Sequence, residues 1–194
     1  PQQRLDLVSP YFVPGDAGKA LLVAAAGRGV RVRILTNSLA SSDEPAVHAG
    51  YAKRREDLLR AGVRLYELKP TAAMEGRAKQ DGFEPKGSAG LHAKTFAVDG
   101  ARIFVGSFNM DQRSVHLNTE MGVVLESPSL AQALGAAFDR TIPEVAYEVR
   151  LDADGRTPYW IERTASGEVR HDTEPATTAW QRIGVEVLSI LPIE

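Results

Sequence analysis

Three short runs of aliphatic residues divide the first part of the chain. They are RLDLV at residues 4–8, VRVRIL at residues 30–35 and VRLYEL at residues 63–68. Their length and β-branched content are typical of strands, and stretches with helical length and spacing lie between them. Strands that alternate with helices predict an α/β fold, with a mixed, largely parallel sheet flanked by helices.

Both intervening stretches carry residues that favour helix ends. We expect Asp16 to cap the first helix, which runs through KALLVAAAGR, and Gly29 to end it. Asp43, followed closely by Pro45, should open the second helix, and Gly62 should stop it. Two successive helix–glycine–strand units support the α/β assignment.

The pattern changes around residue 90. Residues 70–90 are rich in Gly, Lys and Pro without any periodicity, which predicts a mobile loop. Two apolar runs then follow, LHAKTFAV and ARIFVGS, and only Asp99-Gly100 separates them. Because Asp-Gly between alternating apolar runs is typical of a two-residue turn, we expect a β-hairpin here.

A further strand and a helix complete the first 145 residues. Residues 119–126 (TEMGVVLE) have strand composition, and Ser127 with Pro128 is expected to start a helix. That helix places four apolar residues on one face: Leu130, Leu134, Ala137 and Phe138. We assign residues 1–145 to one half domain.

The last 49 residues have a different pattern, which we expect to complete the same domain. Residues 146–172 suggest a three-stranded antiparallel meander, with turns at ADG and ASG. A final helix over about residues 177–190 is expected to follow. It has four apolar residues at helical spacing, Trp180, Ile183, Val187 and Leu191, and we expect core packing of this stripe rather than membrane anchoring.

Composition narrows the possible functions. The chain has 194 residues, a formal net charge of −2 and no cysteine, so disulfides and thiolate metal sites are excluded. The overall charge predicts no attraction to nucleic acid or anionic membranes. No apolar run reaches the roughly 18–20 residues of a transmembrane helix. The chain begins with Pro1 rather than Met, and we expect it to be part of a longer protein.

A small set of residues around the predicted hairpin could bind and attack a phosphoryl group. His92 and Lys94 would share one face of a strand, roughly 7 Å apart, and supply a nucleophile or proton carrier beside a fixed positive charge. Ser107 and Asn109 can donate hydrogen bonds to anionic oxygens, and Glu120 could hold an imidazole in one tautomer. Taken singly, each has a structural explanation as a strand, turn or surface residue. Their joint spacing is far more specific.

That spacing resembles the HKD motif of the phospholipase D superfamily. The matching residues are His92, Lys94, Asp99, Gly106, Ser107 and Asn109. Glu120, 28 positions after His92, stands where the family keeps an acid that orients the histidine. The resemblance makes Asp99 a candidate catalytic residue, whereas its place in an Asp-Gly turn favours a structural role.

The resemblance extends along most of the chain. Residues 9–16, 36–70, 117–128 and 187–194 are similar to the second half of bacterial cardiolipin synthase-type proteins, in particular the cardiolipin synthase C-like branch. Such proteins place two HKD motifs face to face; one histidine becomes a phosphohistidine and the other transfers protons. No second motif follows here, because His48, His116 and His171 each lack a lysine two residues on.

By this resemblance the chain supplies half of an active site. Its partner is the other HKD-bearing half, either a missing N-terminal half or a second copy of the chain. His92 is then better placed as general acid and base, unless two copies pair and it fills both roles. The resemblance implies neither metal nor cofactor.

The resemblance also suggests a pocket for the lipid head group. Its candidate residues are Tyr11, Phe12, Asn37, Asp43, His48 and Tyr51. The structural alternatives are a half-exposed helix face for His48 and Tyr51, and core-edge packing for Tyr11 and Phe12.

The leading functional hypothesis is phosphatidyl transfer between phospholipids, with peripheral membrane contact and no nucleic-acid partner. The expected location is the cytoplasm or the surface of the inner membrane. A phosphodiesterase or nuclease of the same superfamily is one alternative, although a nuclease should have a basic groove. A catalytically incomplete pairing module is the other.

Overall fold

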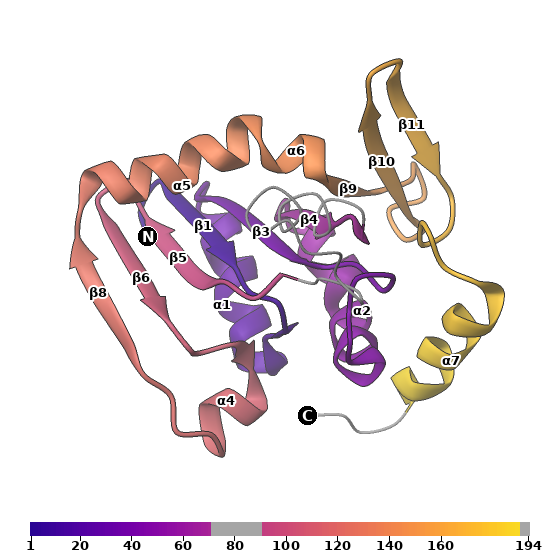
Figure 1. Cartoon of the computed structure of the whole chain (residues 1–194), viewed down its shortest axis with the longest axis horizontal. Coiled ribbons are helices and arrows are strands. Elements are labelled where there is room, and N and C mark those ends of the chain that lie inside the picture. Colours follow the sequence, from indigo (N-terminus) through magenta and orange to yellow (C-terminus); the bar gives the residue numbers. More distant parts are fainter. Residues whose placement is uncertain (71–90, 191–194) are drawn as a thin grey trace, which may run out of the picture.

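A nine-stranded sheet runs through the whole molecule (Figure 1). The computed structural model describes residues 1–70 and 91–190. The strand order is β11-β10-β9-β4-β3-β1-β5-β6-β8. The strands are β1 (Arg4–Val8), β3 (Arg31–Asn37), β4 (Arg64–Leu68), β5 (Lys94–Val98), β6 (Arg102–Gly106), β8 (Gly122–Glu126), β9 (Ala146–Leu151), β10 (Pro158–Thr164) and β11 (Gly167–His171).

The sheet is mixed, as predicted, but its parallel part is small. Of the eight pairings among these described strands, β1–β3 and β3–β4 are parallel and the others are antiparallel. The expectation of a largely parallel sheet is therefore wrong. In this nine-stranded sheet the two parallel pairs are the ones whose strands are connected through α1 (Gly15–Gly27) or α2 (Pro45–Arg60), because a parallel connection needs a long crossover whereas a short turn gives an antiparallel neighbour.

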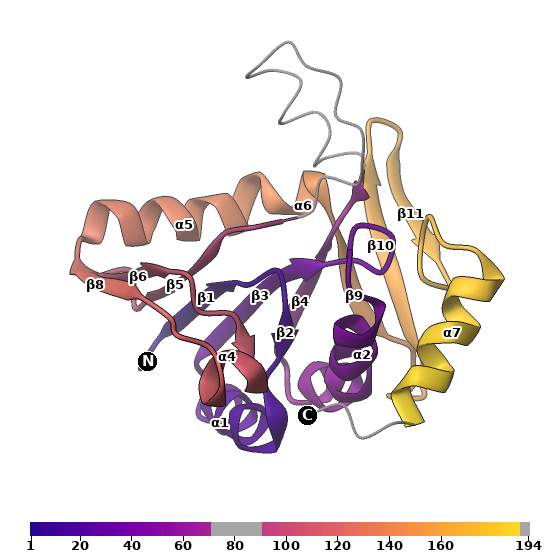
Figure 2. The same ribbon diagram turned by 60° about the horizontal axis from the view of Figure 1, so that its bottom comes forward.

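Helices cover both faces of the sheet (Figure 2). The helices are α1 (Gly15–Gly27), α2 (Pro45–Arg60), α4 (Gln112–His116), α5 (Pro128–Arg140), α6 (Ile142–Val145) and α7 (Ala179–Ile190). Helices α1 and α2 lie on one face, and α5 and α6 lie on the other. Alternate residues of the central strands enter the two cores: Leu7 and Ile34 pack toward α1 and α2, whereas Val8 and Leu35 pack toward α5 and α6.

The glycine stops and the start of α2 at Pro45 are confirmed, but the predicted cap at Asp16 is wrong. Gly29 and Gly62 have φ angles of 84° and 88°, which favour glycine just beyond a helix. Asp16 lies in the first turn of α1, where its charge favours the helix dipole, but it makes no capping hydrogen bond. Asp43 lies before α2 and accepts a hydrogen bond from the Tyr11 hydroxyl instead.

The predicted hairpin is confirmed between β5 and β6. Asp99 and Gly100 have positive φ angles of 53° and 64°, but Val98 pairs with Arg102, so the connection has three residues, Asp99 to Ala101, rather than the two predicted. Lys94 pairs with Gly106 at the open end of the hairpin. The turn and the motif residues His92 and Lys94 therefore lie at opposite ends of β5.

The predicted apolar faces of two helices are only partly correct. In α5, Phe138 is buried and Leu134 and Ala137 pack against the core, but Leu130 is exposed. Ala131 and Gly135 complete the buried face instead.

The stripe on α7 points outward, so the core-packing prediction is wrong. Trp180 is 82% exposed, and Ile183 and Val187 are also exposed. The opposite side of α7, with Val185 and Leu188, packs against α2. Leu191 lies outside the described residues, as does nearly all of the loop predicted for residues 70–90.

The C-terminal meander extends the main sheet. Strands β9, β10 and β11 pair in antiparallel order, and β9 joins the sheet beside β4. The proposed division at residue 145 stays a prediction, since continuous pairing across it is compatible with one domain.

Candidate active site

His92 lies two residues before β5 and is exposed. The prediction that it sits within the strand is wrong by this short distance, since pairing starts at Lys94. The Lys94 ammonium donates a hydrogen bond to the backbone carbonyl of His92 at 3.0 Å. Desolvation lowers the pKa of Lys94 below its usual value, while the nearby carboxylates of Glu120 and Asp111 oppose that shift. The motif lysine is thus a partly buried cation next to the motif histidine.

Ser107 joins the end of β6 to Glu120. Its hydroxyl donates to Glu120 Oε2 at 2.5 Å, and the Asn118 amide donates to Glu120 Oε1 at 3.2 Å. The Ser107 hydrogen bond is the largest cause of a lowered pKa at Glu120, which favours the carboxylate. In the described part of the chain Glu120 makes no hydrogen bond with His92, so its role in orienting the imidazole stays a prediction.

Gly106 allows β6 and β8 to approach each other. A Cβ atom at this position would lie 2.5 Å from the Met121 carbonyl oxygen and 2.8 Å from the Gly122 Cα. The close approach that Gly106 permits is to the neighbouring strand. Gly106 therefore sets the separation between Ser107 and Glu120.

A groove of about 410 Å³ opens beside these residues. Its walls include Tyr11, Glu44, Val47, Asn109, Asp111 and Gln112, with Val13, Arg113 and Asn118 completing the lining. A two-stranded parallel sheet builds it: β2 (Phe12–Val13) pairs with β7 (Met110–Asp111). The segments SPYFVP and GSFNM, far apart in sequence, are brought together by this pairing.

Asn109 brings an unpaired polar atom to the groove. Its Oδ1 is buried and has no hydrogen-bond partner among the described residues. Buried amide oxygens are normally paired, so this atom is a candidate ligand contact. The sequence did not identify Asp111, Gln112 and Asn118 as groove residues, although their position just after the motif was a usable signal.

Asp99 has a structural role. Its carboxylate accepts hydrogen bonds from the backbone amides of Gln2, Gln3 and Arg4 at 2.8–3.1 Å. It lies at the end of β5 remote from Lys94. These contacts support the alternative role of Asp99 in the turn, and the catalytic role carried over from the motif stays a prediction.

Comparison with known proteins decides the family. A family model described as cardiolipin synthase, phospholipase D-like domain matches residues 1–142. The chain belongs to the phospholipase D-like family.

Its relatives include cardiolipin synthases. The chain is 48% identical to cardiolipin synthase C of Escherichia coli strain K12 over 194 residues, all of this chain and 41% of that protein. It is 36% identical to cardiolipin synthase A of Pseudomonas syringae over 120 residues, 62% of this chain and 21% of that protein. The phospholipase D-like chain thus spans less than half the length of these relatives.

Solved structures share the fold. Nuc from Salmonella typhimurium, a phospholipase D family member, has a TM-score of 0.55 at 20% identity, covering 77% of this chain and 84% of Nuc. Phosphatidylserine synthase from Haemophilus influenzae Rd KW20 has a TM-score of 0.53 at 18% identity, covering 79% of this chain and 35% of that structure. These likenesses confirm the phospholipase D-like α/β fold.

Only part of the predicted head-group pocket lines the groove of this phospholipase D-like chain. Tyr11 lies on the wall, and its hydroxyl donates to Asp43 at 2.9 Å. Burial, with added effects from Asp43, raises the pKa of Tyr11 to about 12. Phe12 is buried in the core, and Asn37 is buried with its side chain toward Leu91. The pocket prediction is wrong for Phe12 and Asn37.

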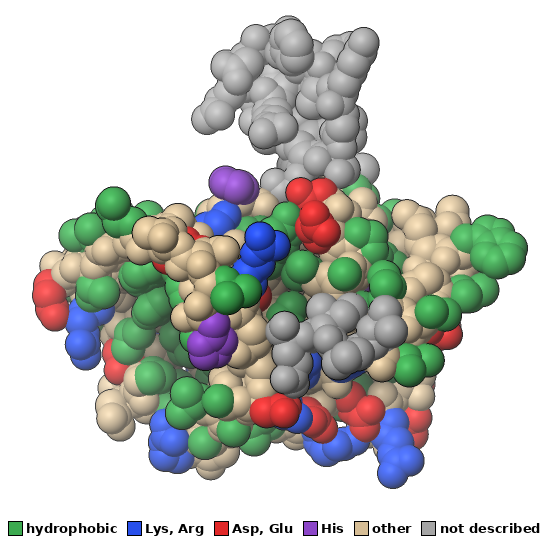
Figure 3. Space-filling model, turned by 90° about the horizontal axis from the view of Figure 1, so that it is seen from below, with side chains coloured by type: hydrophobic (Ala, Val, Ile, Leu, Met, Phe, Trp, Pro, Cys, Tyr) green, Lys and Arg blue, Asp and Glu red, His purple; other side chains and the backbone are tan. Residues whose placement is uncertain are grey.

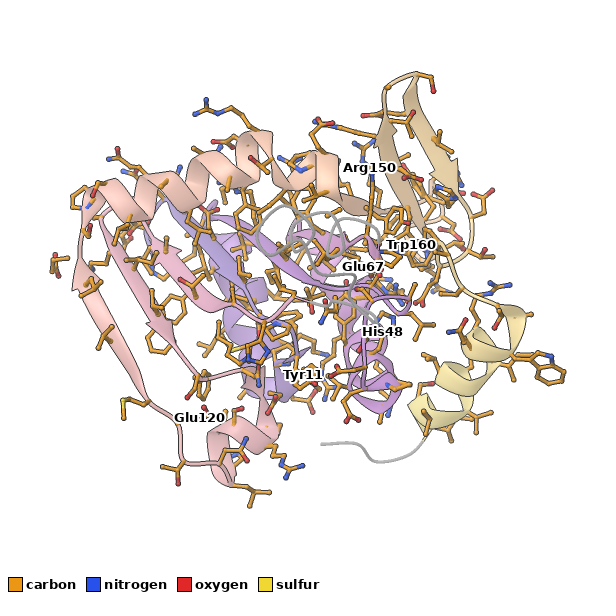
Figure 4. All side chains as sticks on the ribbon, viewed as in Figure 1. Tyr11, His48, Glu67, Glu120, Arg150 and Trp160 are labelled. Atoms are coloured by element: carbon orange, nitrogen blue, oxygen red, sulfur yellow. The ribbon has the colours of Figure 1, made fainter. Side chains whose placement is uncertain are left out.

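His48 and Tyr51 belong to a buried polar network, so both earlier interpretations of them are wrong. His48 Nε2 lies 3.0 Å from Glu174, and Tyr51 donates to Glu67 at 3.1 Å. Arg55 bridges the two carboxylates, with distances of 2.7 Å to Glu174 and 3.0 Å to Glu67. Figure 4 shows His48, Glu67 and Trp160 on the side of α2 and β10, away from Glu120.

The network ties the C-terminal region to the sheet. Trp160 donates to the second oxygen of Glu67 at 2.8 Å. Burial would raise the pKa of Glu174, but hydrogen bonds and charge from His48 and Arg55 lower it to about 2. The sequence signal for this network was the acidic residue Glu67 within the apolar run VRLYEL. In the structure Glu67 is fully buried.

The surface charges are mixed. On the face seen in Figure 3, Lys and Arg side chains are interspersed with Asp and Glu rather than gathered into one stripe. Among the described residues, no helix is both long and apolar enough to cross a membrane. Within residues 1–70 and 91–190, no cluster of three or more His, Asp and Glu side chains could hold a metal ion.

Proposed function

We propose that this chain supplies one half of an active site that transfers phosphatidyl groups between phospholipids. The observation that carries the proposal is the pairing of Lys94 with Gly106, which brings the lysine beside exposed His92 next to Ser107 and its partner Glu120, in a chain of the phospholipase D-like family. The Lys94 ammonium and the Asn109 amide nitrogen would donate to the nonbridging phosphate oxygens, whereas the Ser107 hydroxyl donates to Glu120. Membrane phospholipids carry that phosphodiester, which would place the assembly at a membrane surface.

The proposed reaction has two displacements. An imidazole nitrogen of one motif histidine attacks phosphorus, a phosphorus–nitrogen bond forms and the bond to the first alcohol oxygen breaks. The other histidine gives its proton to that oxygen, then takes a proton from the incoming alcohol. The second alcohol attacks phosphorus and releases the first histidine. We assign proton transfer to His92, a role worth about 10²–10⁴ in rate.

A second HKD-bearing half is needed because this chain has one motif histidine. The surface next to the site is suited to such a partner. Leu117 and Met121 are 80% and 81% exposed, and β8 is an edge strand with every residue exposed. Val115, Val123 and Val124 are also exposed, with Val123 and Val124 on opposite faces of β8. Exposed apolar side chains that gather along one edge mark interaction sites, and Met121 directly follows Glu120 in the chain.

The groove favours a lipid over a nucleic-acid substrate. Glu44 and Asp111 face it with one arginine, Arg113, on the described lining. The two carboxylates would repel the phosphodiester backbone of a nucleic acid, whereas lipid head groups with hydroxyl or ammonium groups fit this groove. We therefore propose that the active assembly makes cardiolipin from phosphatidylglycerol, or from a phosphatidylglycerol–phosphatidylethanolamine pair.

The test compares substrates in one preparation. The chain, alone and joined to a second HKD-bearing half, is given phosphatidylglycerol vesicles with and without phosphatidylethanolamine, and single- and double-stranded DNA at low and moderate salt. Cardiolipin formation that His92→Asn abolishes supports the proposal. Salt-sensitive DNA hydrolysis without lipid turnover moves the function to the nuclease class. Stable pairing without any turnover favours the pairing module.

A further inference from the structure

Asn37 connects the end of β3 to the residue that precedes His92. It is 4% exposed, and its Oδ1 accepts a hydrogen bond from the Leu91 backbone amide at 2.9 Å. The Ser41 hydroxyl lies 3.4 Å from the same oxygen, and the Asn37 amide nitrogen lies 3.5 Å from the Pro10 carbonyl oxygen. One buried side chain thus contacts three separate segments of the chain.

The neighbours of Asn37 make the surrounding region rigid. Thr36 donates a hydrogen bond to the Pro10 carbonyl at 3.2 Å, and Ser41 donates to the Leu68 carbonyl at 3.1 Å. These contacts tie together the chain just beyond β1, the C-terminal part of β3 and the end of β4. Leu91 also packs against the cluster that contains Val8 and Leu35. Asn37 therefore offers Leu91 a fixed acceptor.

The backbone around His92 is held on both sides. Before it, the Leu91 amide is bound by Asn37; at His92 itself, the carbonyl accepts from Lys94. Pairing of β5 with β1 reaches Thr95 opposite Val8. Among the described residues the His92 imidazole has no hydrogen-bond partner, so its position depends on this backbone.

We propose that Asn37 is a positioning residue for His92: it fixes the backbone from which the imidazole reaches the phosphorus centre. The inference rests on the proposed function, because it assigns His92 to the reaction. Asn37 does not line the groove. It acts through Leu91, so its loss should reduce kcat more than it changes KM.

The test uses three variants of the active assembly. Asn37→Ala removes the acceptor and should lower kcat by about 10²-fold, the order expected for a displacement of roughly 1 Å at a reacting group. Asn37→Asp keeps an oxygen acceptor for Leu91 and should recover part of that loss. Thr36→Val is the matched control, since Thr36 is buried next to Asn37 and shares Pro10 but does not contact Leu91.

Amide exchange separates positioning from general stability. By NMR, the Leu91 amide should exchange faster in Asn37→Ala than in wild type, but not in Thr36→Val. An equal loss of kcat in Thr36→Val, or an Asn37→Ala variant with full kcat, overturns the inference. If Asn37→Ala does not fold, Asn37→Asp decides. An Asn37→Asp variant that keeps slow exchange of the Leu91 amide but loses as much kcat as His92→Asn overturns the inference. One that keeps both the slow exchange and its kcat supports the inference.

Failure of this inference can be told from failure of the proposed function. A folded His92→Asn variant with full turnover contradicts the proposed function itself. Loss of turnover in His92→Asn with no kcat effect in Asn37→Ala contradicts only the positioning role.

Discussion

Replacing Asp99 by Asn should lower stability without lowering activity per folded molecule. The Asp99 carboxylate accepts hydrogen bonds from three consecutive backbone amides, at Gln2, Gln3 and Arg4. Asn keeps the left-handed backbone at low cost, because it tolerates the φ of 53° better than most residues, but it loses the charge and one acceptor. Burial alone would raise the pKa of Asp99, but these amides lower it.

The size of the effect follows from those contacts. Hydrogen bonds to a charged group contribute roughly 1.5–3 kcal/mol each when well formed, and Asn retains part of them. Because Asp99 is half-exposed, we expect a net loss of about 1–2 kcal/mol in the free energy of unfolding. For a chain of this length that corresponds to a fall in Tm of about 2–8 °C.

The pH dependence gives a second measurement. The folded pKa of Asp99 is below its unfolded value, so its charge stabilises the fold above the unfolded pKa of about 3.9. That stabilisation is lost as pH falls through the folded pKa. The Tm difference between wild type and Asp99→Asn should therefore be full at pH 6–7 and shrink below about pH 4.

The assay is thermal unfolding by circular dichroism, paired with specific activity at a temperature where both proteins are folded. Asp16→Asn is the control, because Asp16 is an exposed aspartate that makes no hydrogen bond to the backbone amides of α1. Its Tm should change by less than that of Asp99→Asn. An unchanged Tm together with lost activity in Asp99→Asn would refute the structural role and restore the catalytic one.

Three further outcomes are expected. His92→Asn should remove most turnover and Lys94→Ala nearly as much, whereas Glu120→Ala should lose less. Turnover rates measured together with melting temperatures test this order. A folded and active His92→Asn variant contradicts it. The chain alone should turn over lipid only as a symmetric dimer, so robust activity at monomeric mass by light scattering would contradict the half-site. Glu67→Gln should lower the free energy of unfolding by about 3 kcal/mol, because it leaves Arg55 buried with one carboxylate fewer. Urea unfolding measures this, and an unchanged urea midpoint would contradict the prediction.

Local sequence rules determined the elements of this protein and its motif. Strand composition, glycine stops and the Asp99-Gly100 turn depend on residues close together in the chain, so their positions could be read directly. The motif spacing identified His92, Lys94, Ser107 and Asn109 because the hairpin that presents them is itself local. The order of the C-terminal meander was predictable for the same reason.

Tertiary structure alone decided which faces are buried and which side chains meet. The stripe with Trp180 has the helical spacing of a core face, yet α7 packs on α2 through its other side. Periodicity identifies an apolar face but not its partner, and a helix with two apolar sides can bury either one.

The same limit applies to the site. The resemblance suggested that Asn37 lines a pocket, but its side-chain oxygen accepts a hydrogen bond from the amide of Leu91, 54 residues later. His48 and Tyr51 are buried because α2 lies over Glu67 and Arg55 pairs that carboxylate with Glu174. Hydrogen bonds between distant segments depend on the packing of whole elements, so no local pattern predicts them. The sequence alone identified the motif, and the packing of the sheet decided what surrounds it.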